Sequence, residues 1–216
     1  MINKNTKTEH ITKKIIALIL VLPLMSCINF TVKSSNVAGK ITRLNREMPQ
    51  VKADLELKEQ LEKSIESGKK NFLYSNASSE VHFGRYYIDI VEGRVLLTGS
   101  VTNNEIKKYI ISKITENIKV RELLDELAVG DVKINTVNDF FIKRSIMTKI
   151  FFRTKIKSLN YEIRVVNGNT YIIGIAEDEE EMRLLANAIS TVKGVKEVVS
   201  YVITMEHNKK IKLEFL

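Results

Sequence analysis

Several side chains that proteins use for catalysis and cross-linking are scarce in this chain. The 216 residues include one cysteine, two prolines and no tryptophan, so an intramolecular disulfide and a multi-cysteine metal site are both excluded. Beyond residue 26 the histidines are His82 and His207, too far apart in sequence for metal-ligand spacing. No Gly-x-Ser-x-Gly elbow or Walker phosphate loop occurs. We therefore expect no enzymatic activity, no cofactor, no metal and no small-molecule substrate.

Acidic residues are fewer than basic ones. The chain has 34 Lys and Arg residues against 26 Asp and Glu, a formal net charge of +8. An excess of this kind favours an acidic partner, which leaves nucleic acid, anionic lipid and acidic protein surfaces as the candidate classes.

The N-terminus has the pattern of an export signal. An apolar run, Ile15–Leu24, follows the basic residues Lys4, Lys7, Lys13 and Lys14, and it is short for a transmembrane helix. The next residues, Leu24-Met25-Ser26-Cys27, resemble a bacterial lipobox, which implies cleavage before Cys27 and acylation of its thiol, with palmitate among the attached chains. The alternative is a plain secretory signal with an incidental cysteine. Either signal argues against nucleic acid as the partner.

Two segments of the chain repeat each other at an offset of 75 residues. Tyr86–Thr102 reads YYIDIVEGRVLLTGSVT and Tyr161–Glu177 reads YEIRVVNGNTYIIGIAE. The register continues without a gap from Val120 to its counterpart Val195, and onward through Leu123/Val198 and Leu127/Val202. A duplicated unit therefore predicts two small domains.

The first unit begins with a helical pattern from Ala53, where Leu57, Leu61 and Ile65 share one face. Asp54 is the expected N-cap of this helix and Gly68 its stop. Strands are predicted at 83–91 and 94–101, a helix from the capping box Thr102-x-x-Glu105 to about 117, and a last strand at 120–129. The buried stripe of the second helix is predicted to be Ile106, Ile110 and Ile114, and Asp89 and Glu92 are expected on the hairpin surface.

The second unit repeats this order. A helix is predicted at 139–152, strands at 161–167 and 169–176, a helix opened by Asp178-x-x-Glu181, and a strand at 195–204. The acidic run Glu177–Glu181 is interpreted as charge that matches the helix dipole, not as a metal site. Asn167-Gly168 is a strong hairpin signal. Four glycines are predicted to be structural turn positions: Gly93, Gly99, Gly168 and Gly174.

The predicted fold class is α+β, with two tandem domains. Each domain is α-β-β-α-β, with a three-stranded mixed sheet covered on one face by two helices. The predicted boundaries are 1–26 for the lipoprotein signal peptide, 27–52 for a tether, 53–130 and 131–205 for the two domains, and 206–216 for a charged tail.

The motif G-x-V-x-L-x-G, followed by a helix and V-x-x-V, resembles the BON domain (bacterial OsmY and nodulation). It occurs as Gly93–Gly99 with Val120 and Leu123, and again as Gly168–Gly174 with Gly194-Val195-Lys196-Glu197-Val198. Thr170 and Lys119 depart from the family pattern. With the lipobox, the chain is similar to dual-BON outer-membrane lipoproteins. That resemblance implies a lipid-anchored, non-enzymatic phospholipid-binding protein on the periplasmic face of the outer membrane, where it supports membrane integrity.

The helix predicted at 139–152 is the candidate contact surface. At about 100° per residue, Ile142, Ile146 and Ile150 form a stripe that should face the sheet. A different sector carries aromatic and basic side chains, which we assign to anionic phospholipid binding: Phe140, Phe141, Lys143, Arg144, Lys149, Phe151, Phe152, Arg153 and Lys155.

Two other interpretations of this helix remain open. The phenylalanines could pack against the other domain or within the core. The same face could also dock envelope proteins, which would make the chain an adaptor that regulates an envelope assembly machine or a cell-wall enzyme.

Overall fold

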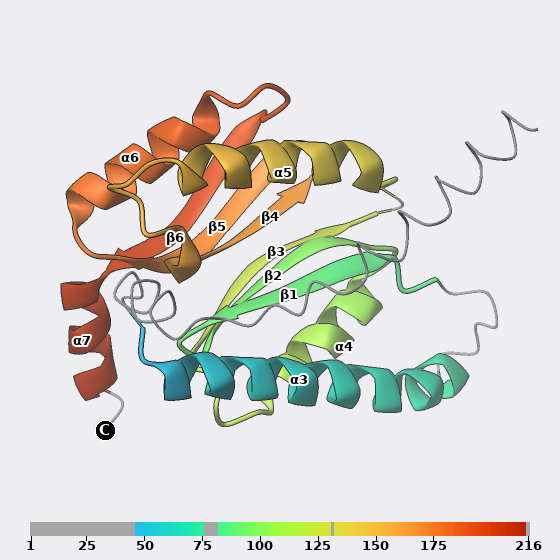
Figure 1. The fold of residues 1–216 in the computed structure, drawn as a ribbon. Helices are drawn as coiled ribbons and strands as arrows, with labels where there is room; N and C mark the ends of the chain where they lie inside the picture. Colours follow the sequence, from blue (N-terminus) through green and yellow to red (C-terminus); the bar gives the residue numbers. More distant parts are fainter. Residues whose placement is uncertain (1–45, 76–81, 131, 215–216) are drawn as a thin grey trace, which may run out of the picture. The chain divides into compact units, whose positions relative to one another are not determined.

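The computed structural model describes residues 46–75, 82–130 and 132–214, so Cys27, the signal peptide and most of the predicted tether lie outside it. The described part of the chain contains two units of the same element order (Figure 1). The elements of the first unit are α3 (Met48–Ser75), β1 (Arg85–Val91), β2 (Arg94–Val101), α4 (Asn104–Thr115) and β3 (Glu122–Val129). Those of the second are α5 (Thr136–Phe151), the 3-10 turn η2 (Ser158–Asn160), β4 (Tyr161–Val166), β5 (Asn169–Ala176), α6 (Glu179–Ser190) and β6 (Glu197–Thr204), followed by α7 (Met205–Glu214).

Each unit has a three-stranded mixed sheet, which confirms the predicted α+β class with two such sheets. The strand orders are β1-β2-β3 and β4-β5-β6, antiparallel at the hairpin and parallel at the second pairing. The parallel register is the same in both units: Arg94 is opposite Glu122, and Asn169 is opposite Glu197. The second helix of each unit is the crossover that parallel pairing requires.

Each unit has its own apolar core between its helices and one face of its sheet. The predicted stripes of α3, α4 and α5 are buried in these cores: Leu57, Leu61 and Ile65; Ile106, Ile110 and Ile114; Ile142, Ile146 and Ile150. Burying each such side chain contributes roughly 1.5–3 kcal/mol. These stripes also decide which face of each helix remains outside.

A buried aspartate on the first helix of each unit fixes the hairpin turn. The Asp54 carboxylate accepts hydrogen bonds from the Glu92 and Gly93 N–H groups at 2.7 and 2.9 Å. Asp139 accepts from the N–H groups of Asn167 and Gly168 at 2.8 and 2.9 Å. All four turn residues have positive φ, the geometry of a type I′ hairpin.

The prediction that Asp54 is an N-cap is therefore wrong, because α3 begins at Met48 and Asp54 lies inside it. Burial raises the pKa of Asp54, against the two backbone N–H bonds and the Arg46 charge, which lower it. Gly68 does not stop the helix either, since α3 continues to Ser75. Instead, a Cβ at Gly68 would meet the hydroxyl of Tyr109, which donates to the Ile65 carbonyl at 2.7 Å.

Two further details differ from the predictions. Asn103, not Thr102, caps α4 and accepts from the Ile106 N–H, while the Thr102 hydroxyl donates to the His82 carbonyl. Gly99 and Gly174 lie inside β2 and β5, not in turns. At Gly99, where φ is +112°, a Cβ would collide with the backbone of Arg85 and Tyr86 on the paired strand. These glycines allow a close approach between strands.

Other caps and ends follow the sequence more closely. Asp178 caps α6 by accepting from the Glu181 N–H at 2.8 Å, as the capping box predicts. The Glu181 carboxylate in turn accepts from the backbone N–H groups of Glu177 and Lys157. The stretch predicted as a charged tail is helical as far as Glu214.

The opposite faces of the two sheets contribute to a third apolar cluster. Val91 and Leu96 of the first unit meet Ile173 and Ile175 of the second. Asp89 and Glu92, predicted on the surface, are 4% and 5% exposed. Asp89 accepts two hydrogen bonds from the Arg164 guanidinium, at 2.9 and 2.6 Å.

Equivalent positions of the repeat meet at this junction. Asp89 and Arg164 are 75 residues apart, and so are Glu126 and Tyr201, whose hydroxyl donates to the Glu126 carboxylate. In a two-fold interface, residues near the axis contact their own counterparts. The two units thus associate as a pseudo-symmetric pair, but with opposite or complementary side chains at the matched positions.

Candidate functional site

Helix α5 is held to its sheet in a way that fixes its outer face. Asn135 caps it by accepting from the Asn138 N–H at 3.1 Å. Ile142, Ile146 and Ile150 are at most 4% exposed, and Asp139 binds the hairpin turn beneath them. Because 100° separates successive residues, the side chains opposite this stripe must point away from the unit.

That outer face carries the predicted phenylalanines. Phe140, Phe141, Phe151 and Phe152 are between 58% and 76% exposed. They form two edge-to-face pairs, with ring centroids 5.6 Å apart for Phe140 and Phe141 and 5.5 Å apart for Phe151 and Phe152. Within the described residues these rings pack in neither the core nor the junction between the units. Clustered exposed apolar side chains usually mark an interaction site.

Sequence reasoning missed two members of this face. Val137 is 67% exposed and Met147 is 38% exposed, and both fall in the same sector as Phe140, Phe151 and Arg144. The sequence does contain a signal for these two residues, because apolar residues recur at steps of three and four outside the isoleucine stripe. We define the outer aromatic face as the following residues: Val137, Phe140, Phe141, Arg144, Met147, Thr148, Phe151 and Phe152.

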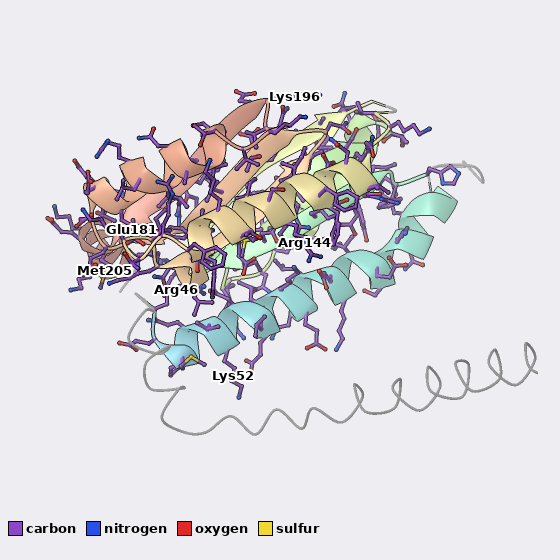
Figure 2. The ribbon with its side chains drawn as sticks, turned by 45° about the horizontal axis from the view of Figure 1, so that its top comes forward. Arg46, Lys52, Arg144, Glu181, Lys196 and Met205 are labelled. Atoms are coloured by element: carbon purple, nitrogen blue, oxygen red, sulfur yellow. The ribbon has the colours of Figure 1, made fainter. Side chains whose placement is uncertain are left out.

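The predicted basic residues divide into two groups. Arg144, Arg153 and Lys155 are exposed and form no ion pair with any residue that the structure describes. Arg144 lies in the middle of α5 (Figure 2). Arg153 and Lys155 follow the helix and line a hollow of about 300 Å³ with Phe152, Thr154, Ile156 and Leu184.

Lys143 and Lys149 lie on the flanks of α5 and not on its outer face. The Lys149 ammonium donates to the Thr191 hydroxyl at 2.5 Å, on the α6 side. Lys143 is half-buried beside the junction, where burial, followed by the charge of Arg164, lowers its pKa while Asp89 and Glu162 raise it. The charge directed outward is thus carried by Arg144, Arg153 and Lys155.

The corresponding helix of the first unit has no such face. The large apolar residues exposed on the described part of α3 are Met48 and Leu55. Around them, lysines pair with glutamates one turn away: Lys52 with Glu56, Lys63 with Glu59 and Lys69 with Glu66. A helix face of this kind is ordinary solvated surface.

The described residues offer neither a membrane-spanning helix nor a metal-binding cluster. None of the helices there has the length and apolar character needed to cross a bilayer. In the same part of the chain, no cluster of three or more His, Cys, Asp or Glu side chains is arranged to bind a metal ion.

Comparison with known proteins places part of the chain in a family. The BON domain model matches residues 138–205. The chain is also similar to a protein of Anaplasma centrale described as an uncharacterized protein in the gshII 5' region. The two are 34% identical over 130 residues, which cover 59% of this chain and 85% of the relative.

Among solved structures, the chain resembles CdsD, described as a structural protein of the type III secretion system of Chlamydia trachomatis. One CdsD structure gives 11% identity and a TM-score of 0.28, covering 67% of this chain and 94% of that one. The C-terminal domain of CdsD gives 14% identity and a TM-score of 0.24, covering 66% and 67%. We infer neither a shared fold nor a shared role from scores this low.

Proposed function

This chain belongs to the family of the Anaplasma centrale protein and carries a BON domain, and from that premise we propose that it is a lipid-anchored, non-enzymatic protein that binds anionic phospholipid. It acts from the periplasmic side of the outer membrane and supports the integrity of that membrane. The first unit is proposed as a second BON domain, because it repeats the element order and strand register of the matched one.

The observation that carries the proposal is the outer aromatic face beside three cations without an anionic partner among the described residues. Aromatic rings enter the headgroup region of a bilayer readily, and each Lys or Arg near an anionic surface contributes about 1 kcal/mol. Arg144, Arg153 and Lys155 together would then contribute about 3 kcal/mol. The hollow beside Phe152 could admit part of a lipid headgroup or acyl chain between Lys155 and Leu184.

The lipid anchor supplies the second half of the proposal. Cys27 lies outside the described residues, and its support is the lipobox-like sequence. The lipobox implies more than one acyl chain on Cys27, and each buried CH₂ contributes about 0.8 kcal/mol, so the anchor alone would hold the protein at the membrane. A tether also keeps α5 near the bilayer at high effective concentration. The anchor would thus supply the attachment, and α5 would supply the contact with anionic headgroups.

Vesicle co-sedimentation tests the lipid contact. The chain from residue 28 onward should bind vesicles that contain phosphatidylglycerol and should bind pure phosphatidylcholine vesicles much less. Phe141→Ser combined with Phe151→Ser should abolish binding, whereas Leu55→Ser, on the exposed face of α3, should leave it unchanged. Equal binding to both vesicle types, or equal binding by both variants, would refute the lipid contact.

The anchor is tested in cells. We expect the protein to incorporate a labelled fatty acid and the Cys27→Ser variant to lose that label. The labelled protein should fractionate with the outer membrane. Cells without the protein should leak a periplasmic marker, and the Cys27→Ser variant should fail to correct the leak. Recovery of unlabelled protein in the soluble periplasm would show that the N-terminus is a plain secretory signal.

The adaptor alternative is separated by cross-linking. A photoreactive amino acid at Phe141 in intact cells should yield lipid adducts. A single stoichiometric protein adduct would instead show that the outer aromatic face docks an envelope protein.

A further inference from the structure

Helix α5 and its C-cap have a sequence that reads nearly the same in both directions. The stretch Phe140–Phe152 is FFIKRSIMTKIFF, and four of the six residue pairs on either side of Ile146 are identical. The two exceptions are Arg144 with Thr148 and Ser145 with Met147. The phenylalanine pairs at the two ends therefore lie at equal distances from Ile146.

The exposed face of the helix shares this symmetry. Ile146 is the middle residue of the buried stripe, so the middle of the outer aromatic face lies opposite it, at the same height on the helix. At 1.5 Å per residue, the nearer ring of each phenylalanine pair is about 8 Å from that height. A two-fold axis at this point would exchange the two ends of the face. Two-fold axes relate identical patches, so they require a surface that is complementary to itself.

A second copy of α5, placed antiparallel about this axis, meets that requirement. The N-terminal phenylalanine pair of one copy would lie against the C-terminal pair of its partner, and aromatic pairs add stability beyond the area that they bury. Arg144 would face the partner's Thr148, since that pair is an exception to the symmetry. The two Arg144 side chains would be offset by about 6 Å along the helix and would not oppose each other directly.

The area of the face is sufficient for a specific contact. Its four phenylalanines are between 58% and 76% exposed. With about 200 Å² for a whole aromatic side chain, these rings expose about 500 Å² in each copy. Two copies would bury about 1,000 Å² through the rings alone, which is the lower bound for a specific interface and is typical of a reversible one.

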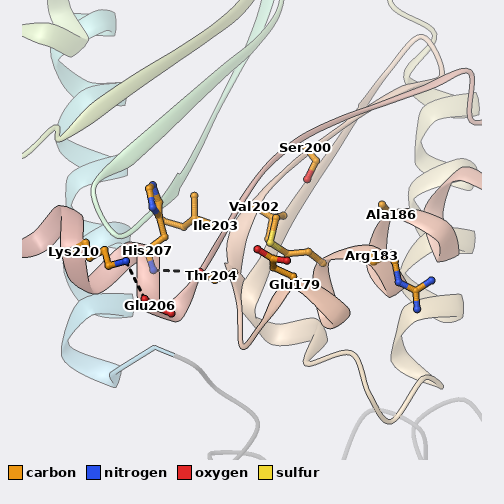
Figure 3. Close-up of a pocket in the computed structure, with 11 residues that line it drawn as sticks. Glu179, Arg183, Ala186, Ser200, Val202, Ile203, Thr204, Glu206, His207 and Lys210 are labelled. Carbon is orange, nitrogen blue, oxygen red and sulfur yellow. Dashed lines mark hydrogen bonds and ion pairs between the residues drawn. The ribbon is translucent and has the colours of Figure 1, made fainter.

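The pocket of about 790 Å³ between α6, β6 and α7 is less suited to a second copy (Figure 3). Met182, Ala186 and Val202 give it apolar walls, and Lys210 on its rim already pairs with Glu206 at 2.9 Å. A concave patch that meets its own copy about a two-fold axis leaves a void, whereas the ridges of a helix face pack into the grooves of another helix. The outer aromatic face is therefore the surface that favours self-association.

We propose that two copies of this chain pair antiparallel through the outer aromatic face, α5 against α5, and that anionic phospholipid competes with this pairing. The pairing does not depend on lipid binding, whereas the competition rests on the proposed function. No residue from Phe140 to Lys157 is acidic, so the paired faces gain no attraction between opposite charges. A phosphate surface offers that attraction to Arg144, Arg153 and Lys155. An anionic membrane would thus draw the face away from the partner copy, and a neutral membrane would not.

Photo-cross-linking of the full-length protein tests both parts. The protein, purified as cells process it and carrying a photoreactive amino acid at Val137, is reconstituted in vesicles. On pure phosphatidylcholine we expect a dimeric adduct that maps to residues 152–155 of the partner copy, because antiparallel pairing places the start of one α5 beside the end of the other. On phosphatidylglycerol the adduct should fall about tenfold or more, and added salt should restore it by screening the lipid charge.

Two further variants assign the adduct to the outer aromatic face. Phe141→Ser with Phe151→Ser should abolish it while the unfolding midpoint is kept, because both rings are exposed. The photoreactive amino acid at Leu55, on the exposed face of α3, should give no dimeric adduct on either lipid.

The outcomes separate this proposal from the proposed function. No dimeric adduct on phosphatidylcholine would overturn the pairing and leave the lipid contact untouched. An adduct that joins position 137 to itself would show a parallel pair and overturn the two-fold arrangement. Equal yields on both lipids would overturn the competition and would also count against lipid contact at this face.

Discussion

Helices α3 and α5 occupy the same place in two units that share element order, register and turn geometry. Each turns a stripe of aliphatic residues toward a sheet and binds a hairpin through one buried aspartate. Their outer faces differ: α3 carries lysine–glutamate pairs, and α5 with its C-cap carries four exposed phenylalanines beside cations that pair with no described acidic residue. The two helices thus share the inner face that the fold requires and differ in the outer face that it does not.

The largest expected effects come from the two aspartates that the units share. Asp139→Ala would leave two buried backbone N–H groups without acceptors, at about 1–3 kcal/mol each, so the free energy of unfolding should fall by roughly 2–6 kcal/mol. Asp54→Ala should cost more, because it also removes the nearer of the two carboxylates, Asp54 and Glu92, that pair with the buried Arg46 guanidinium. Urea unfolding of both variants measures the difference. Equal losses would show that Arg46 contributes nothing to the first unit.

The matched charges at the junction give the next effect. Arg164→Asp places a carboxylate against Asp89 and should destabilise the chain by about 3 kcal/mol, since it breaks a largely buried ion pair. The reversed pair, Asp89→Arg with Arg164→Asp, should recover most of that loss by the same urea measurement. Failure of the reversed pair to recover stability would mean that Lys58 and Lys143, rather than the pseudo-two-fold contact, determine the charge required at position 89.

The outward cations of the second unit should affect binding without affecting stability. Changing Arg144, Arg153 and Lys155 to Gln should weaken binding to anionic vesicles by about 3 kcal/mol, roughly a hundredfold, and should remove most of the salt dependence. Lys52→Gln with Lys63→Gln on α3 is the matched control, with no expected loss. Comparable weakening by both sets would indicate a general charge effect and not a defined face.

A pair of helix caps gives the smallest effect. Asn103→Ala should cost about 1 kcal/mol, because the side chain bonds to the Ile106 N–H at the start of α4. Asp178→Ala should cost about the same at α6. Thr102→Ala should cost less than either, since its hydroxyl bonds to an exposed loop carbonyl. Thermal unfolding of the three variants checks this order, and a larger loss for Thr102→Ala would reverse it.

The fold was largely readable from the sequence, for definite reasons. Strand ends followed from Glu92-Gly93 and Asn167-Gly168, and the repeat predicted that the two units share one element order. Local signals failed where a tertiary contact decided the outcome. Asp54 is of a residue type that often caps helices, but its carboxylate oxygens bind a turn 38 and 39 residues away. Glycine often ends a helix, but at Gly68 the lack of a side chain instead leaves room for Tyr109.

Prediction of the candidate site failed for the same reason, at the positions where tertiary contacts decide the outcome. Periodicity was enough to separate the isoleucine stripe of α5 from its phenylalanines. It could not show that Lys143 lies beside Asp89 of β1 and Arg164 of β4, or that Lys149 reaches Thr191 at the end of α6. The direction of a long flexible side chain depends on the polar and charged groups nearest to it in space, which a single sequence does not reveal.

The absence of tryptophan from this chain allows a direct test of the difference between α3 and α5. Phe151→Trp and Leu55→Trp each place one fluorophore at an exposed apolar position of the two matched helices. On anionic vesicles that contain brominated lipids, we expect the emission at position 151 to shift to the blue and to be quenched, and the emission at position 55 to stay unchanged. Equal quenching at both positions, or none at position 151, would contradict the assignment of the membrane contact to the outer aromatic face of the second unit.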